Sequence, residues 1–170
     1  MKKRILALLL AVCVACSMLI LPASASGSNT AVQTAVTLGG LTSDQTANLA
    51  APLTRGALTK LMVAFSAYRE SAKTQGSTGT LFSDVGSGSA YAPYVRIAVQ
   101  QGWISGYTDG TFRPEQYITR AETVTMINRM LGRNYETATE LHSMACPFPD
   151  VSQSSWAYGN IMEAAITHKH

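Results

Sequence analysis

The chain repeats itself at a nearly constant spacing, and this periodicity limits its fold more than any other feature. The segment Phe-Ser-Asp-Val at 82–85 returns as Phe-Pro-Asp-Val at 148–151, an offset of 66 (148 − 82). Leu-Thr-Arg at 53–55 returns as Ile-Thr-Arg at 118–120, an offset of 65 (119 − 54). Self-similarity at a fixed offset is the signature of repeat architectures. The sequence therefore predicts one structural unit that is used more than once.

The clearest helix start in the chain is at Thr119. Thr119 and Glu122 have the spacing of a capping box, in which the hydroxyl accepts from the Glu122 N–H and the carboxylate accepts from the Thr119 N–H. We expect a helix from Thr119 to a C-terminal cap at Gly132. Its apolar face is predicted to consist of Val124, Ile127, Met130 and Leu131.

Two more helices follow from helical spacing of apolar residues. One follows 82–85, ends at Gly102 and carries Val95, Ala98 and Val99; the other follows Thr54 and carries Leu58, Leu61, Met62 and Phe65. Asp84 and Asp150 are expected to accept hydrogen bonds from backbone N–H groups at turns or helix starts. The predicted class is all-α, with helix-loop-helix units and little room for a sheet.

Three motifs in order connect this unit to a known family. They are Phe-Ser-Asp-Val at 82–85, Gly-Tyr-Thr-Asp-Gly-Thr-Phe-Arg-Pro at 106–114 and Ile-Thr-Arg-Ala-Glu at 118–122. Together they resemble one repeat of the S-layer homology (SLH) domain, the wall-anchoring module of exported bacterial proteins. The resemblance implies a three-fold helical bundle built from three repeats.

Only the middle repeat is complete in this sequence. We expect a partial first repeat at 41–80, a complete second repeat at 81–133, a linker at 134–147 and a truncated third repeat at 148–170. Where the second repeat has Ala121 and Glu122, the first has Gly56 and Ala57, so it lacks the capping-box carboxylate.

The family resemblance implies a carbohydrate-binding function. SLH domains bind secondary cell-wall polysaccharide, commonly at a pyruvylated sugar, in grooves between repeats, and the Arg of Thr-Arg-Ala-Glu holds the sugar. On this resemblance the partner is a glycan linked to peptidoglycan, and the chain is a non-enzymatic anchor at the bacterial cell wall or cell surface. No cofactor is expected.

The chemistry of Arg120 agrees with that resemblance. Arg120 lies at the first position of the helix predicted after Thr119, beside free backbone N–H groups, where the helix dipole disfavours a cation. An anion such as a carboxylate suits this position, because the N–H groups and the guanidinium can hold it together. Arg55 matches Arg120 in the first repeat and is a second candidate. An ion pair between Arg120 and Glu115 is the structural alternative.

The loop before Thr119 supplies further candidate ligand contacts. Gly106 and Gly110 allow close approach of the backbone to a sugar ring, Asp109 can accept hydrogen bonds from hydroxyl groups, and Tyr107, Trp103 or, outside this loop, Trp156 can stack on the ring. Each has a structural alternative. Asp109-Gly110 is a general turn signal, Thr119 and Glu122 are more often caps than ligand contacts, and Trp103 and Trp156 are more often core residues.

The N-terminus has the features of a secretory signal peptide. Three basic residues precede an apolar run over 5–21, and Pro-Ala-Ser-Ala at 22–25 supplies a cleavage pattern after residue 25. A retained membrane anchor and a lipoprotein cut before Cys16 are alternatives. The next segment, 26–40, is small and polar and is predicted to be a flexible lead-in.

Cleavage after residue 25 would change the charge and the cysteine content. It removes three of the 13 Lys and Arg and none of the 10 Asp and Glu, so the formal net charge becomes zero (10 − 10). No basic stripe then remains for nucleic acid. Only Cys146 remains of the three cysteines, so no intramolecular disulfide is expected.

Two other functions stay open. One is lateral assembly of the repeats as a surface-layer module, and the other is an anchor fragment of a larger exported enzyme. His142 and Cys146 are four residues apart, but no second ligand pair accompanies them, so no metal site is predicted. No membrane association is expected after signal cleavage.

Overall fold

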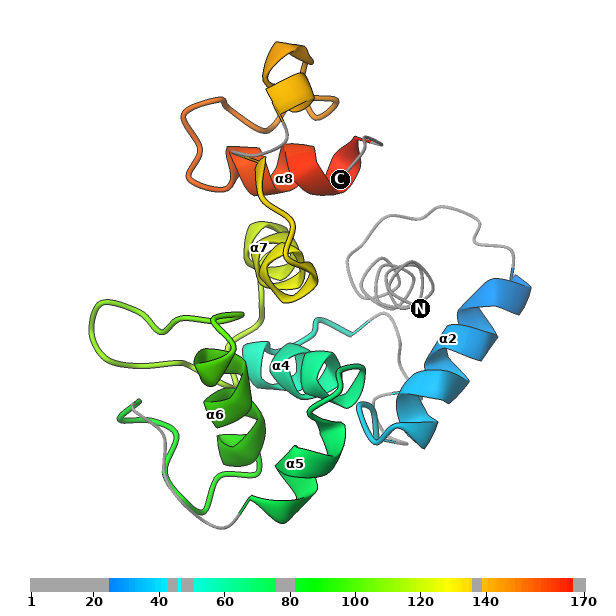
Figure 1. Cartoon of the computed structure of the whole chain (residues 1–170), viewed down its shortest axis with the longest axis vertical. Helices are drawn as coiled ribbons and strands as arrows, with labels where there is room; N and C mark the ends of the chain where they lie inside the picture. The colour runs from blue at the N-terminus through cyan, green and yellow to red at the C-terminus, as the bar shows by residue number, and fades with distance from the viewer. Residues whose placement is uncertain (1–24, 43–45, 47–50, 76–81, 136–138, 167–170) are drawn as a thin grey trace. The chain divides into compact units, whose positions relative to one another are not determined.

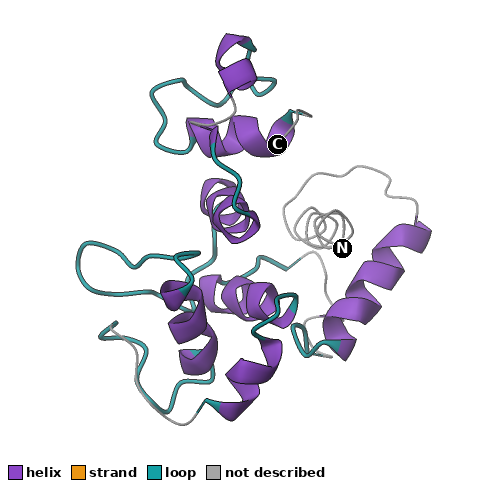
Figure 2. Cartoon of the chain, viewed as in Figure 1, coloured by secondary structure: helices purple, strands orange, loops and turns teal. Residues whose placement is uncertain are grey.

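The computed structural model describes residues 25–42, 46, 51–75, 82–135 and 139–166 (Figure 1). These residues form six α-helices and a short 3-10 helix: α2 (Ala25–Thr37), α4 (Arg55–Ala64), α5 (Arg69–Thr74), α6 (Ala92–Gln100), α7 (Arg120–Leu131), η2 (Thr139–Ser143) and α8 (Tyr158–Ala165). Figure 2 shows no strand in this part of the chain, where the extended backbone contributes one isolated bridge between Thr54 and Tyr117. The prediction of an all-α protein is confirmed.

The predicted signal peptide, residues 1–25, lies outside the described residues except for Ala25. Among the helices that are described, none has the length and apolar character that crossing a membrane requires. The boundaries predicted for the repeats and their assembly into a three-fold bundle remain predictions.

The helices form two compact units, Met1–Ile118 and Thr119–His170. The boundary falls inside the predicted complete repeat, directly before the start of α7. Each unit therefore pairs a helix of the Thr-Arg type with the helix that follows the next Phe-x-Asp-Val motif. In the first unit α4 packs against α6, and in the second α7 packs against α8.

The core of the first unit follows the predicted apolar pattern of α4. Thr54 caps this helix by accepting from the Ala57 N–H, and all four residues of the predicted face are buried, namely Leu58, Leu61, Met62 and Phe65. The partner helix α6 ends before Gly102, whose φ of 70° completes the turn. On α6 the predicted Val95 and Ala98 are buried, whereas Ile97 is buried in place of Val99.

The N-terminal segment differs from the sequence-based expectation. Residues 26–40 are predicted to be a flexible lead-in, but most of this segment belongs to α2. Ala31, Val32 and Ala35 are buried. Small side chains let a helix pack closely without the large aliphatic residues that make an apolar period visible, which explains why the sequence pattern is weak here.

In the second unit, α7 has both predicted ends. Thr119 is its N-cap, and Gly132 follows its last residue with a φ of 68°. The buried face is rotated relative to the prediction, since Met126, Ile127 and the polar Asn128 are buried while Val124, Met130 and Leu131 are only half-buried. The Asn128 amide is satisfied by donating to the Asn160 carbonyl at 2.9 Å, which joins α7 to α8.

The segment 134–147, predicted to be a linker, is packed in its described part. It contains η2, and Leu141 within η2 is fully buried. The Tyr135 ring lies 4.6 Å from the His142 ring and 6.2 Å from the Tyr158 ring, between centroids. A linker with these contacts is an integral part of the second unit.

Candidate functional site

The loop between α6 and α7 is seated on the N-terminal end of α4. The Arg55 N–H donates to the Gln116 carbonyl at 2.9 Å, and the Gly56 N–H donates to the Pro114 carbonyl at 2.8 Å. A third bond runs from the Ile118 N–H to the carbonyl of Leu53 at 2.9 Å. The first N–H groups of α4, which normally need an external acceptor, are therefore satisfied by the loop.

The Arg55 side chain reinforces this contact. It is only 5% exposed, and its Nε donates to the Phe112 carbonyl at 2.9 Å. Its Nη2 donates to the Ser105 carbonyl at 3.3 Å. The guanidinium also lies 4.7 Å from the centroid of the Tyr107 ring and 4.8 Å from that of the Phe112 ring. The proposed second anion site at Arg55 is thus filled by groups of the protein itself.

Within the loop, Asp109 has partners on both sides of its carboxylate. Oδ1 accepts from the Thr111 N–H at 3.0 Å and from the Thr111 hydroxyl at 2.6 Å, and Oδ2 accepts from Arg113 Nη2 at 2.7 Å. The hydrogen bond from the Thr111 hydroxyl and then that from Arg113 lower the pKa of Asp109 to about 2. Asp109 is ionised at neutral pH. Its hydrogen bonds to Thr111 and Arg113 close the turn, which is a structural role.

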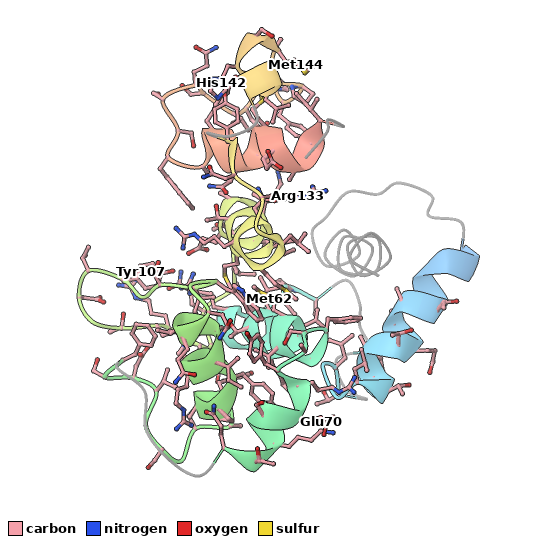
Figure 3. All side chains as sticks on the ribbon, viewed as in Figure 1. Met62, Glu70, Tyr107, Arg133, His142 and Met144 are labelled. Atoms are coloured by element: carbon pink, nitrogen blue, oxygen red, sulfur yellow. The ribbon has the colours of Figure 1, made fainter. Side chains whose placement is uncertain are left out.

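Tyr107 lies on the loop between α6 and α7 (Figure 3). The Arg113 guanidinium lies 4.1 Å from the centroid of its ring, and the Arg55 guanidinium lies over the same ring. The backbone N–H of Tyr107 donates to the Thr111 carbonyl at 2.8 Å, which closes the turn around Gly110. Tyr107 is therefore held by cations of its own unit, and a sugar ring that stacked on it would have to displace Arg113.

Two glycines have the roles that a tight loop requires. Gly110 has a φ of 78°. At Gly106 a Cβ atom would collide with the Phe82 ring and would lie 2.7 Å from the Thr111 carbonyl oxygen. Gly106 is needed because the loop approaches Phe82 closely, and no ligand has to be invoked for it.

Asp84 ties the loop to the Phe-Ser-Asp-Val motif. It accepts from the Phe112 N–H at 2.8 Å and from the Arg113 N–H at 2.6 Å. The Phe82 and Phe112 rings stack beside these bonds with centroids 5.5 Å apart. Asp84 does accept from backbone N–H groups, but they belong to a loop 28 and 29 residues away rather than to a nearby helix start.

Arg120 has a different environment in the second unit. The capping box is present, since the Thr119 hydroxyl accepts from the Glu122 N–H at 3.2 Å and the Glu122 carboxylate accepts from the Thr119 N–H at 2.9 Å. Arg120 is the first residue of α7, and its side chain is 39% exposed. Within the described part of this unit, no acceptor is bonded to the backbone N–H groups of Arg120 and Ala121.

The contacts of the Arg120 guanidinium are loose. It lies 4.2 Å from the centroid of the Phe148 ring, and Nη1 is 4.0 Å from Oδ2 of Asp150, whose side chain is 71% exposed. Within its own unit, the ion partner of Arg120 is Asp150, whereas the Glu115 that the sequence suggested belongs to the first unit. Asp150 faces a guanidinium, whereas its counterpart Asp84 is bonded to backbone N–H groups.

The two tryptophans have different roles. Trp103 is buried and contacts the Tyr68 ring edge to face at 5.9 Å, so it is a core residue. Trp156, in the segment just before α8, is 68% exposed. Its exposure contradicts the expectation of a core residue and leaves the indole accessible.

No group of three or more His, Cys, Asp or Glu side chains that suits a metal ion occurs among the described residues. His142 instead has its Nε2 3.1 Å from the Tyr135 carbonyl oxygen, and Cys146 is a half-buried free thiol.

Sequence reasoning missed two features of this region. Arg113 is one, because its contacts with Tyr107 and Asp109 depend on the shape of the loop. The other is Gly56, where a Cβ atom would lie 2.9 Å from atoms of the Tyr91 ring. A glycine in the first turn ordinarily weakens a helix. In the structure, the absence of a Cβ atom at Gly56 leaves room for the Tyr91 ring. The sequence signal for this contact was that the first repeat has Gly56 at the position where the second repeat has Ala121.

Comparisons with known proteins point to one family. Residues 81–124 match the family model of the S-layer homology domain. The chain is 48% identical over 77 residues to Cell surface glycoprotein 1 of Acetivibrio thermocellus, a match that covers 45% of this chain and 3% of that protein. It is 42% identical over 77 residues to the Cellulosome-anchoring protein of the same organism, which covers 45% of this chain and 16% of that protein. It is 36% identical over 83 residues to an endoglucanase of a Bacillus species, covering 49% of this chain and 8% of the enzyme. No solved structure matches the chain.

Proposed function

We propose that the chain anchors itself, or protein joined to it, to the bacterial cell wall by binding secondary cell-wall polysaccharide, because residues 81–124 match the S-layer homology domain. The names of its relatives, a cell surface glycoprotein and a cellulosome-anchoring protein, support a role at the cell surface. The chain spans a small part of each of these relatives, at most 16% for these two, so the partners of the whole protein belong to the proposal.

The observation that carries the proposal is that the Arg120 side chain is accessible and only weakly paired. Its backbone is fixed by the capping box, its side chain is 39% exposed, and its acid partner is 4.0 Å away. An exposed ion pair at that distance contributes little, whereas a bidentate carboxylate makes two charge-assisted hydrogen bonds with the guanidinium fork. A carboxylate on a sugar, such as a pyruvate ketal, would therefore compete well with Asp150.

Phe148 and Trp156 supply the apolar part of the proposed site. The Phe148 ring supports the face of the Arg120 guanidinium, which leaves the edge with its N–H groups for the ligand. The exposed indole of Trp156 offers a flat surface of the kind that stacks on a sugar ring. In this proposal Thr119 positions Arg120, and Arg55 and Tyr107 stabilise the loop 106–114 of the first unit rather than contact the sugar.

Lateral self-assembly and attachment to a larger exported enzyme remain alternatives. The endoglucanase relative shows that a similar segment occurs in a protein named as an enzyme. For this chain we propose a non-enzymatic anchor that is secreted through the predicted signal peptide.

Co-sedimentation of residues 26–170 with purified peptidoglycan sacculi tests the proposal. The key variant is Arg120→Ala, and Arg129→Ala on the exposed side of the same helix is its matched control. We expect binding to be lost for Arg120→Ala and for sacculi stripped of acid-labile polysaccharide, and to persist for Arg129→Ala. Trp156→Ala is expected to weaken binding without altering the helical circular dichroism.

Equal binding by Arg120→Ala and the unchanged chain would refute the proposed site. Sedimentation without sacculi separates the alternative, because lateral assembly would bring the protein down alone.

A further inference from the structure

Resting on the proposed function, we infer that Asp150 is a specificity residue of the Arg120 site, where it acts as an internal competitor for anions. Its carboxylate neutralises the exposed guanidinium, so a ligand anion must displace it or overcome its repulsion. A small anion that contacts Arg120 alone is thereby disfavoured. A carboxylate joined to a sugar still binds, because the rest of the sugar adds contacts. Arg120 and Asp150 both belong to the second unit.

The Arg120 guanidinium is neutralised without being hydrogen-bonded. Its Nη1 lies 4.0 Å from Oδ2 of Asp150, close enough for an ion pair but too far for a hydrogen bond. Among the described residues of the second unit, no acceptor is bonded to this guanidinium. The side chain is 39% exposed, so its N–H groups are open to a carboxylate from outside.

Phe148 directs a ligand anion toward Asp150. The guanidinium lies 4.2 Å from the centroid of the Phe148 ring, which covers one face and leaves the edge for hydrogen bonds. A carboxylate oxygen bonded to Nη1 would lie about 2.8 Å from it. Because Oδ2 of Asp150 is 4.0 Å from the same nitrogen, the two carboxylate oxygens would be no more than about 7 Å apart. Like charges at this distance repel each other, since it is shorter than the screening length of about 8 Å in physiological salt.

The Asp150 carboxylate does not hold the backbone. Its counterpart Asp84 accepts from the Phe112 N–H at 2.8 Å and from the Arg113 N–H at 2.6 Å. Among the described residues, Asp150 accepts from no backbone N–H, and its side chain is 71% exposed. The carboxylate can therefore turn away from Arg120 when a ligand arrives, and its removal should not disturb the fold of the second unit.

The size and the sign of the expected effect follow from the weakness of this ion pair. Exposed ion pairs contribute little, so removing the charge of Asp150 should strengthen anion binding only about threefold. The sign is the decisive part. Damage to the fold, or loss of a contact between Asp150 and the ligand, would weaken binding, whereas the loss of a competitor strengthens it.

The first test is acetate binding by residues 26–170, followed by the nuclear magnetic resonance signal of the Arg120 Nε–H group. This signal is identified by its absence in Arg120→Ala. Asp150→Asn is expected to shift the signal in the absence of acetate and to lower the dissociation constant of acetate about threefold. Glu115→Gln removes the same charge from an exposed residue of the first unit and should change neither. Circular dichroism checks that each variant is helical.

Sacculus binding by the same variants connects the competitor to the glycan. We expect Asp150→Asn to bind about threefold more tightly than the unchanged chain, and Glu115→Gln to bind equally. Asp150→Glu keeps the charge on a longer side chain that can reach Arg120, so it should bind no more tightly than the unchanged chain. A gain for Asp150→Asn alone assigns the effect to the charge beside Arg120.

The inference is overturned if Asp150→Asn leaves the acetate dissociation constant unchanged or raises it, or if Glu115→Gln produces the same gain. It is also overturned if Asp150→Asn weakens sacculus binding, because Asp150 would then be a ligand contact. Failure of the proposed function is separate from this. If the unchanged chain does not bind sacculi but the acetate results hold, Asp150 is the competitor at an anion site that serves another ligand.

Discussion

Arg55 and Arg120 hold the same position of the Thr-Arg motif, but the first is 5% exposed and the side chain of the second is 39% exposed. Arg55 donates to two carbonyl groups of a loop in its own unit, while Arg120 has a carboxylate at 4.0 Å. The same motif therefore supplies a structural arginine in one repeat and an accessible one in the next.

Truncating these two arginines should destabilise the protein to very different extents. Arg55→Ala removes a buried charged donor and leaves the carbonyls of Phe112 and Ser105 without it, so we expect a loss of about 3 kcal/mol in the free energy of unfolding. Arg120→Ala should lower it by less than about 1 kcal/mol, because exposed ion pairs contribute little. Urea unfolding followed by circular dichroism measures both values. Similar losses for the two variants would contradict the assignment.

The capping box makes a prediction about α7 alone. Glu122→Ala removes the carboxylate that accepts from the Thr119 N–H and should reduce stability by about 1 kcal/mol. Glu115→Ala, a change of the same type at an exposed loop residue, is the control and should have little effect. Hydrogen exchange of α7 would show the loss locally. An unchanged exchange rate in its first turn would mean that Thr119 suffices as the cap.

Asp109 predicts a dependence on pH. Its pKa is lowered to about 2, so the folded state favours the ionised carboxylate. The stability that Asp109 contributes is present above its ordinary pKa near 3.8 and is lost as the pH falls through about 2. Asp109→Asn should therefore destabilise the protein at pH 7 and have a much smaller effect near pH 2. The measurement is the urea midpoint of both proteins across this range. A difference that did not depend on pH would assign the effect to shape rather than charge.

Gly56 should tolerate no side chain. A Cβ atom there would meet the Tyr91 ring at 2.9 Å, so Gly56→Ala is expected to destabilise the first unit by about 1–3 kcal/mol despite the better helix propensity of alanine. At Gly86 a Cβ atom would have no neighbour within 4 Å, and Gly86→Ala is the control. Thermal unfolding of the two variants decides the matter. A stabilised Gly56→Ala protein would show that the Tyr91 ring moves aside freely.

Sequence alone predicts the features that depend on neighbouring residues. The start of α7 at Thr119 and its end before Gly132 follow from side-chain capping and from a positive φ, and both are local. The apolar face of α4 is equally visible, since Leu58, Leu61 and Met62 have helical spacing.

Other features depend on contacts between distant residues, and sequence reasoning does not reach them. Nothing near Asp84 shows that its partners are the N–H groups of Phe112 and Arg113. The burial of Arg55 depends on a loop that begins some fifty residues later, as its bond to Ser105 shows. The sequence predicts the same burial for Trp103 and Trp156, but the first is buried and the second is exposed. Burial is decided by the residues that pack over each ring.

The boundary before Thr119 determines which gene fragments and duplications keep the helix pairs intact. Helix pairing is out of phase with the sequence repeat, so a fragment that ends at residue 133 would keep α7 and lose α8, the helix that covers it. Duplication of any stretch one full period long preserves every pair, wherever the stretch begins. Recombination between genes of this kind therefore preserves the helix pairs when the exchanged segment is one full period long. That segment can begin at any point of the repeat.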